Sequence, residues 1–100
     1  MTIIATDNEG KITLSLDGWL DTISAPELGE EIEKIEKAEE IVLDLDKVEY
    51  IASAGLRQVI ACHKKAKSIG ASFAVINVGR ETMSVFSLTG LDKKLNITAK

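Results

Sequence analysis

The chain has 100 residues, of which 45% are hydrophobic and 28% charged, with a formal net charge of −4. That length and apolar content suit a single domain with one hydrophobic core, and we expect residues 1–100 to form it. The acidic balance argues against a surface for nucleic acid or anionic membranes, because both need a basic patch.

The cysteine content and the hydropathy of the sequence indicate the cellular compartment of the protein. Cys62 is the only cysteine, so the chain cannot close an internal disulfide, which fits a reducing environment. The first residues, MTIIATDNEGK, lack a basic region followed by a long apolar run. No stretch approaches the roughly 18 apolar residues that span a bilayer. We therefore expect a soluble, cytoplasmic protein.

The N-terminal third predicts a β-hairpin followed by a helix. The β-like runs MTIIA and KITLSL flank the turn residues of TDNEG, and GWLDTI then ends the paired region. Residues 24–40 predict the helix, with Ser24 as its N-cap and Glu27 at capping-box spacing. Its apolar stripe consists of Leu28, Ile32 and Ile35.

The rest of the chain alternates strands and helices. Apolar runs at residues 40–48 and 72–78 predict buried strands. A helix over residues 53–69 separates them and ends at Gly70, and a shorter helix over residues 80–90 precedes a C-terminal edge strand. This order implies parallel pairing and a layered α/β sheet.

The helix over residues 53–69 is amphipathic. On a helical wheel its apolar residues share one broad arc, which must face the sheet, and most of its charged residues lie opposite. The arc consists of Gly55, Leu56, Val59, Ile60, Cys62, His63, Ala66 and Ile69. We expect the helix and two strands to share one core, formed by Leu56, Val59, Ile60, Leu43, Leu45, Val75 and Ile76.

Ser53 precedes the first turn of this helix, which predicts an N-cap whose hydroxyl accepts from the amide of Gly55 or Leu56. Three features indicate a further use. The neighbouring Ala52, Ala54 and Gly55 are too small to shield the hydroxyl. The site follows the carboxyl end of a predicted parallel strand, where α/β sheets place functional surfaces. Finally, a helix N-terminus accommodates a phosphate.

The sequence opposes catalysis and metal binding. His63, the only histidine, lies ten residues beyond Ser53 on the same helix, roughly 15 Å away, whereas a catalytic base must lie within about 3 Å. Cys62 and His63 are adjacent and point about 100° apart, so they cannot chelate a metal together. Gly79 precedes a helix without a phosphate-binding glycine motif. We expect no enzyme activity, metal or cofactor.

Three segments, GWLDTISAPEL, YIASAGLRQVI and VFSLTGLDKKLNI, follow one another along the chain. They resemble the G-x-L-D…A-P-x-L stretch, the phosphorylation segment and the C-terminal V-F-x-L-T-G-L-D segment of STAS domains, the bacterial anti-sigma-factor antagonists. The resemblance covers essentially the whole chain. It implies an α/β fold with a central mixed, mostly parallel sheet of four to five strands, and with helices packed mainly on one face.

The resemblance also implies a function in transcription regulation by partner switching. An unphosphorylated antagonist of this family binds an anti-sigma factor that is also a serine kinase, and so frees the sigma factor. The kinase phosphorylates the antagonist, and a PP2C-type phosphatase restores it. By position the phosphoacceptor is Ser53, and Asp21 matches a family aspartate near the phosphoserine. The implied partner-binding residues are Asp21, Ala52, Ala54, Gly55 and Arg57.

The sequence departs from the family pattern at two positions, and one of these departures keeps an alternative open. Ala52 stands where many phosphorylated members have Asp, and Ala54 where they often have a second hydroxyl residue. The missing Asp favours a STAS scaffold or regulatory subunit that is not phosphorylated, within a signalling or lipid-transport assembly. A small hydrolase that uses Ser53 is a third hypothesis, which the distance to His63 opposes.

Overall fold

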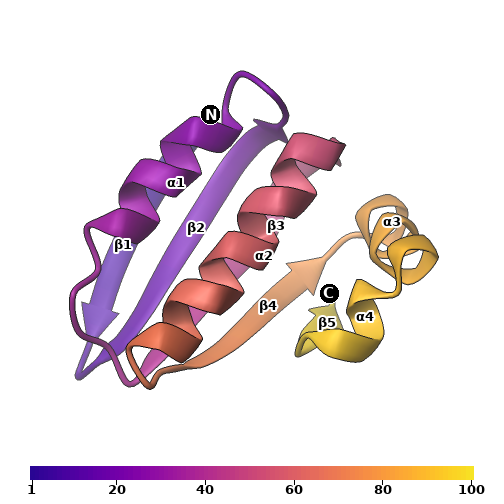
Figure 1. Ribbon diagram of the computed structural model, residues 1–100. Coiled ribbons are helices and arrows are strands. Elements are labelled where there is room, and N and C mark those ends of the chain that lie inside the picture. Colours follow the sequence, from indigo (N-terminus) through magenta and orange to yellow (C-terminus); the bar gives the residue numbers. More distant parts are fainter.

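Five strands form one sheet in the order β1-β2-β3-β4-β5 in the computed structural model, which describes residues 1–100 (Figure 1). β1 pairs antiparallel with β2, and the other neighbouring pairs are parallel. The predicted mixed, mostly parallel sheet is confirmed. The strands are β1 (Thr2–Asn8), β2 (Lys11–Leu20), β3 (Glu40–Ile51), β4 (Ser72–Val78) and β5 (Ile97–Ala99).

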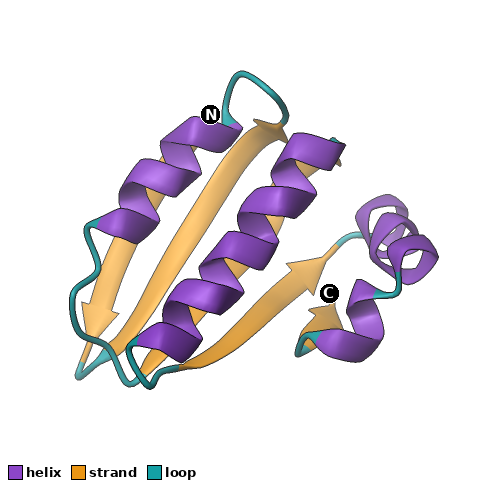
Figure 2. Cartoon of the chain, in the orientation of Figure 1, coloured by secondary structure: helices purple, strands orange, loops and turns teal.

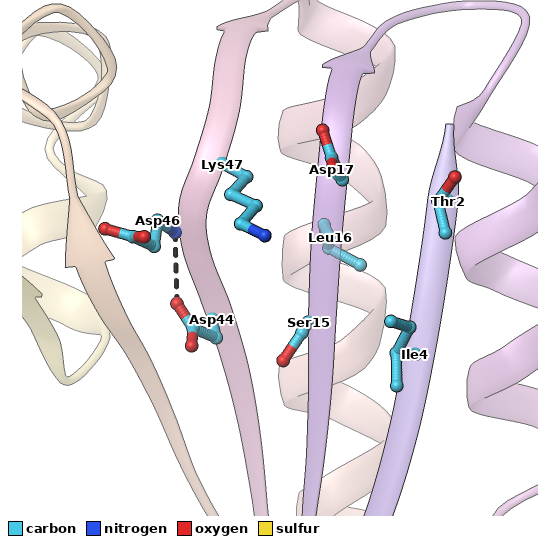
Figure 3. Close-up of a pocket in the computed structure, with 8 residues that line it drawn as sticks. All are labelled: Thr2, Ile4, Ser15, Leu16, Asp17, Asp44, Asp46 and Lys47. Carbon is cyan, nitrogen blue, oxygen red and sulfur yellow. Dashed lines mark hydrogen bonds between the residues drawn. The ribbon is translucent and has the colours of Figure 1, made fainter.

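The two helices that flank β3 in sequence cover one face of this sheet, and the opposite face is bare (Figures 2 and 3). They are α1 (Ala25–Glu33) and α2 (Ser53–Ser68), which lie side by side. Two further helices, α3 (Arg80–Thr89) and α4 (Leu91–Lys94), lie beyond β4 near the end of the chain. None of the helices has the length and hydropathy needed to cross a membrane.

The hydrophobic core lies between the sheet and the helices. The prediction of one shared core is confirmed for four fully enclosed residues, Leu43, Leu45, Val59 and Val75. Leu56 and Ile60 are half-buried at the margin of the same core. The prediction is wrong for Ile76, because side chains alternate along β4 and Val75 already takes the helix-covered side. Ile76 therefore points to the bare face.

α1 is shorter than predicted. It ends at Glu33 instead of continuing to residue 40. The backbone amides of Glu39 and Glu40 both donate to the carbonyl of Gly10, which draws the chain into the sheet and away from helical hydrogen bonds. Ile35 is buried, as expected of the apolar stripe, but it reaches the core from the loop that precedes β3.

β2 and β3 are longer than their apolar runs predict. The pairing of β2 ends within GWLDTI, as expected, but only after the first three of these residues, at Leu20. β3 continues to Ile51, and the register pairs Trp19 with Tyr50 and Leu20 with Ile51. The ends of both strands therefore lie together where α2 begins.

Leu43→Ala should lower the free energy of unfolding by about 2–5 kcal/mol, because Leu43 is fully buried in the central strand β3. Leu56→Ala should cost less, because the Leu56 side chain is only half-buried. Urea unfolding followed by circular dichroism measures both losses. Equal losses would show that Leu56 is enclosed as fully as Leu43.

Candidate functional site

Ser53 is the first residue of α2, at the edge of the sheet where β2 and β3 end. Its exposure at a helix start agrees with the sequence-based expectation. The predicted N-cap is wrong by one residue: Ala52 holds that position with an extended backbone, and its carbonyl accepts from the Leu56 amide at 3.0 Å. No side chain caps α2, because only the residue at the cap position can turn its side chain onto the first amides.

The start of α2 carries backbone amides without backbone hydrogen-bond partners. The Ala52 amide donates to the Leu20 carbonyl at 2.9 Å, and the first bond within the helix comes from the Leu56 amide. The amides of residues 53–55 therefore lack intrahelical partners, and the first turn contains no acidic residue. The helix dipole would stabilise a negative charge on Ser53 by about 0.3–1 kcal/mol.

Gly55 sets how closely α2 approaches the ends of the strands. It is buried, and a Cβ built on it would lie 2.6 Å from the Leu20 carbonyl oxygen and 2.9 Å from Cγ1 of Ile51. Any larger residue would push the helix away from β2. Gly55 therefore packs beneath Ser53, and its contact with a partner stays a prediction.

Asp21 organises the loop between β2 and α1. Its Oδ1 accepts hydrogen bonds from the backbone amides of Ile23 and Ser24, each at 3.0 Å, and lies 3.1 Å from the Ser24 hydroxyl. These contacts, led by the Ser24 amide, hold the pKa of Asp21 below its ordinary value of 3.8. The carboxylate that was predicted to contact a partner is thus engaged within its own loop.

Ser24 completes the same loop. It is the N-cap residue of α1, as predicted, but the capping box with Glu27 does not form. Its hydroxyl turns back, donates to the Trp19 carbonyl at 2.5 Å and accepts from the Asp21 amide at 2.9 Å. The Asp21 amide thus takes the place of the Glu27 amide as the donor to the Ser24 hydroxyl. The result is a loop closed on itself by two side chains.

The other predicted contact residues lie around Ser53. Ala52 and Ala54 are half-buried, and Arg57 is exposed one turn further along α2. Asp21 reaches the same edge because the preceding residue, Leu20, is hydrogen-bonded to Ala52. The structure therefore brings the predicted residues together at the start of α2, with Gly55 beneath them.

Three exposed apolar residues at the same end were missed in the sequence: Trp19, Ile23 and Tyr50, which are 57%, 86% and 51% exposed. The rings of Trp19 and Tyr50 lie across β2 and β3 with centroids 5.6 Å apart. They point to the bare face, because their neighbours Leu20 and Ile51 are buried on the helix-covered side.

The bare face of the sheet carries a shallow hollow of about 280 Å³ (Figure 3). The Asp44 carboxylate in it has structural partners: its Oδ1 accepts from the Asp46 amide at 3.0 Å and from Nδ2 of Asn77 at 3.1 Å. No group of acidic, histidine or cysteine side chains is placed to hold a metal ion. The hollow is lined by Thr2, Ile4, Ser15, Leu16, Asp17, Asp44, Asp46 and Lys47.

Cys62 and His63 lie far along α2 from Ser53. Cys62 is buried, and burial raises the pKa of its thiol to about 12, which keeps it protonated and unreactive. The His63 ring packs against Phe73, with centroids 5.7 Å apart. Neither side chain takes part in the surface around Ser53.

Comparisons with known proteins agree with this architecture. A family model described as "STAS domain" matches residues 2–100. The anti-sigma-B factor antagonist of Bacillus subtilis is 31% identical over 94 residues, which cover 93% of this chain and 86% of that protein. The anti-sigma-F factor antagonist RsfB of Mycobacterium tuberculosis is 34% identical over 101 residues, which cover 97% and 80%.

A solved structure has the same fold. The crystal structure of an anti-sigma factor antagonist from Mycobacterium paratuberculosis superposes with a TM-score of 0.88 at 30% sequence identity. The match covers 99% of this chain and 86% of that one. The similarity therefore includes all five strands and the helices that carry the surface around Ser53.

Gly55→Ala should destabilise the fold, although alanine normally favours a helix over glycine by about 0.5–1 kcal/mol. The added methyl would lie 2.6 Å from the Leu20 carbonyl oxygen, so α2 must shift. Gly29→Ala in α1 is the matched control, because its Cβ meets only the flexible Gln58 side chain, at 3.1 Å. That variant should be at least as stable as wild type in thermal unfolding. Equal stabilities of the two variants would contradict the close approach.

Asp21→Asn should lower stability in a pH-dependent way. The folded pKa of Asp21 is below 3.8, so its carboxylate stabilises the fold fully above that pH. The contribution is lost as pH falls through the lowered folded pKa. The difference between wild type and Asp21→Asn should therefore be constant near neutrality and shrink on acidification. Urea unfolding between pH 2 and 7 measures it, with Glu30→Gln on the exposed face of α1 as control. A difference that grows in acid would contradict the assignment.

Proposed function

The chain belongs to the STAS domain family, and from that premise we propose that it is an anti-sigma-factor antagonist switched by phosphorylation of Ser53. In this function the edge around Ser53 binds an anti-sigma factor while the serine is unmodified. The observation that carries the proposal is the position of Ser53: it is exposed and uncapped at the first position of α2. The antagonists named among its relatives support the partner class.

The switch requires a kinase and a phosphatase. The anti-sigma factor, acting as a serine kinase, transfers the γ-phosphoryl group of ATP to Ser53 Oγ. The new O–P bond replaces the bond to ADP, and the hydroxyl proton passes to a base of the kinase. A PP2C-type phosphatase hydrolyses the phosphoserine with water and releases inorganic phosphate. The exposed Ser53 hydroxyl, flanked by Ala52 and Ala54, leaves room for both enzymes.

The phosphate acts at the contact surface and leaves the fold intact. It adds about −1.5 to −2 charges, which the helix dipole stabilises. In a complex, however, the phosphate would stand between α2 and the partner. There it adds bulk and must lose its water, which is unfavourable. Binding is therefore lost while the domain stays folded.

A non-phosphorylated scaffold or regulatory subunit is the alternative function. The alanine at position 52, in place of the Asp of many phosphorylated members, favours it because the kinase then lacks a recognition charge. The two functions differ in one observable, the phosphate on Ser53. A hydrolase is the weakest hypothesis, since Ser53 and His63 are separated by about three turns of α2.

Ser53→Glu should fold normally but bind its anti-sigma factor at least about tenfold more weakly, which corresponds to about 1.4 kcal/mol. Ser53→Ala should bind like wild type and accept no phosphate. Calorimetric titration with the purified anti-sigma factors of the same genome measures affinity, and mass spectrometry after incubation with ATP measures phosphorylation. Ser68→Glu, at the other end of α2, is the matched control and should bind normally.

Two results would favour the scaffold instead. One is a wild-type protein that binds but gains no phosphate from any of these kinases. The other is a phosphate that appears equally in wild type and Ser53→Ala, because it must then lie on another residue.

A further inference from the structure

We propose that Trp19, Ile23 and Tyr50 form an apolar anchor patch that docks the anti-sigma partner beside Ser53. The patch rests on the antagonist function proposed above and specifies the chemistry of the same partner. Its occupant is an apolar cleft of the anti-sigma factor, flanked by basic side chains. None of the three is among the partner-binding residues that the resemblance implies.

Most of the exposed large apolar side chains lie at one edge of the sheet. Five large apolar side chains of the chain are exposed, and Ile4 and Leu88 lie apart from one another on β1 and α3. The other three gather where β2 and β3 end. Exposed aromatic groups that cluster in this way mark protein contacts, and Trp and Tyr contribute most of the binding energy of such surfaces.

The anchor patch lies within reach of Ser53. Tyr50 is three residues before Ser53, so their Cα atoms are at most about 11 Å apart. Trp19 pairs with Tyr50 across the strands, and its neighbour Leu20 is hydrogen-bonded to Ala52. A standard interface covers about 800 Å² on each partner, which is enough to include the serine and the patch together.

The patch is held in position before any partner binds. The Trp19 indole Nε1 donates to Glu49 Oε2 at 3.3 Å, and its ring lies against Tyr50. Ile23 stands on the loop that Asp21 closes, with its amide bonded to that carboxylate. Side chains fixed in this way lose little conformational freedom on binding, which favours affinity.

The charged groups around the anchor patch indicate which chemistry a matching partner surface has. Glu49 is hydrogen-bonded to Trp19, and Asp21 lies in the loop beside Ile23, so two carboxylates border the patch. A partner that matches this edge presents an apolar centre with basic groups around it. A phosphate on Ser53 would then lie beside the apolar contact, where it must be desolvated. The patch thus explains why modification of an exposed serine would release the partner.

Trp19 is the only tryptophan, so it reports on the patch directly. The test is to incorporate 5-fluorotryptophan and to follow its single ¹⁹F resonance while unlabelled, purified anti-sigma factors of the same genome are added. The resonance should shift when a partner binds. Trp19→Ala and Tyr50→Ala should each weaken binding at least about tenfold. Leu88→Ala, which removes an exposed apolar residue of α3, is the matched control and should bind like wild type.

The outcomes separate the patch from the function on which it rests. Binding that depends on Ser53 but leaves the ¹⁹F resonance and the affinity of Trp19→Ala unchanged overturns the patch and leaves the antagonist function standing. No binding by wild type to any of these anti-sigma factors overturns both. A resonance that shifts with the concentration of this chain alone overturns the patch as well, because a second copy then occupies it.

Discussion

The contact between the start of α2 and the end of β2 determines the arrangement of the whole functional edge. The Leu20 carbonyl accepts the Ala52 amide at 2.9 Å and lies 2.6 Å from where a Cβ on Gly55 would be. Only a glycine permits this approach. Because Leu20 precedes the loop of Asp21 and follows Trp19, one contact places the serine, the loop and the aromatic pair at the same edge.

Two kinds of electrostatic group meet at this edge, and they have different roles. The free amides at the start of α2 favour a negative charge on Ser53, which makes the phosphorylated state compatible with the fold. The carboxylate of Asp21 instead binds the amides of its own loop. We therefore infer that Asp21 positions Ile23 for contact. A switch built in this way changes the surface of the domain and leaves its core unchanged.

The sequence predicted features that depend on local periodicity. The apolar runs of β3 and β4 and the wheel of α2 located about half of the core, and small residues around Ser53 predicted its exposure. Features set by tertiary structure were missed. The N-cap of α2 is an alanine, whose side chain gives no capping signal in the sequence. The Ser24 hydroxyl donates to the Trp19 carbonyl, which a local pattern does not show. The packing role of Gly55 depends on its distance from Leu20. The Trp19–Tyr50 pair follows from a strand register that local patterns do not encode.

A switch at Ser53 is tested most directly by the affinity of the phosphorylated protein for the anti-sigma factor. Phosphoserine incorporated genetically at position 53 gives a homogeneous sample, which can be compared with the unmodified protein by calorimetric titration against the purified anti-sigma factor. We expect the unmodified protein to bind and the phosphoserine to weaken binding by about a hundredfold or more, or about 2.8 kcal/mol. Circular dichroism should show both proteins equally folded. Equal affinity of the two proteins would contradict a switch at Ser53.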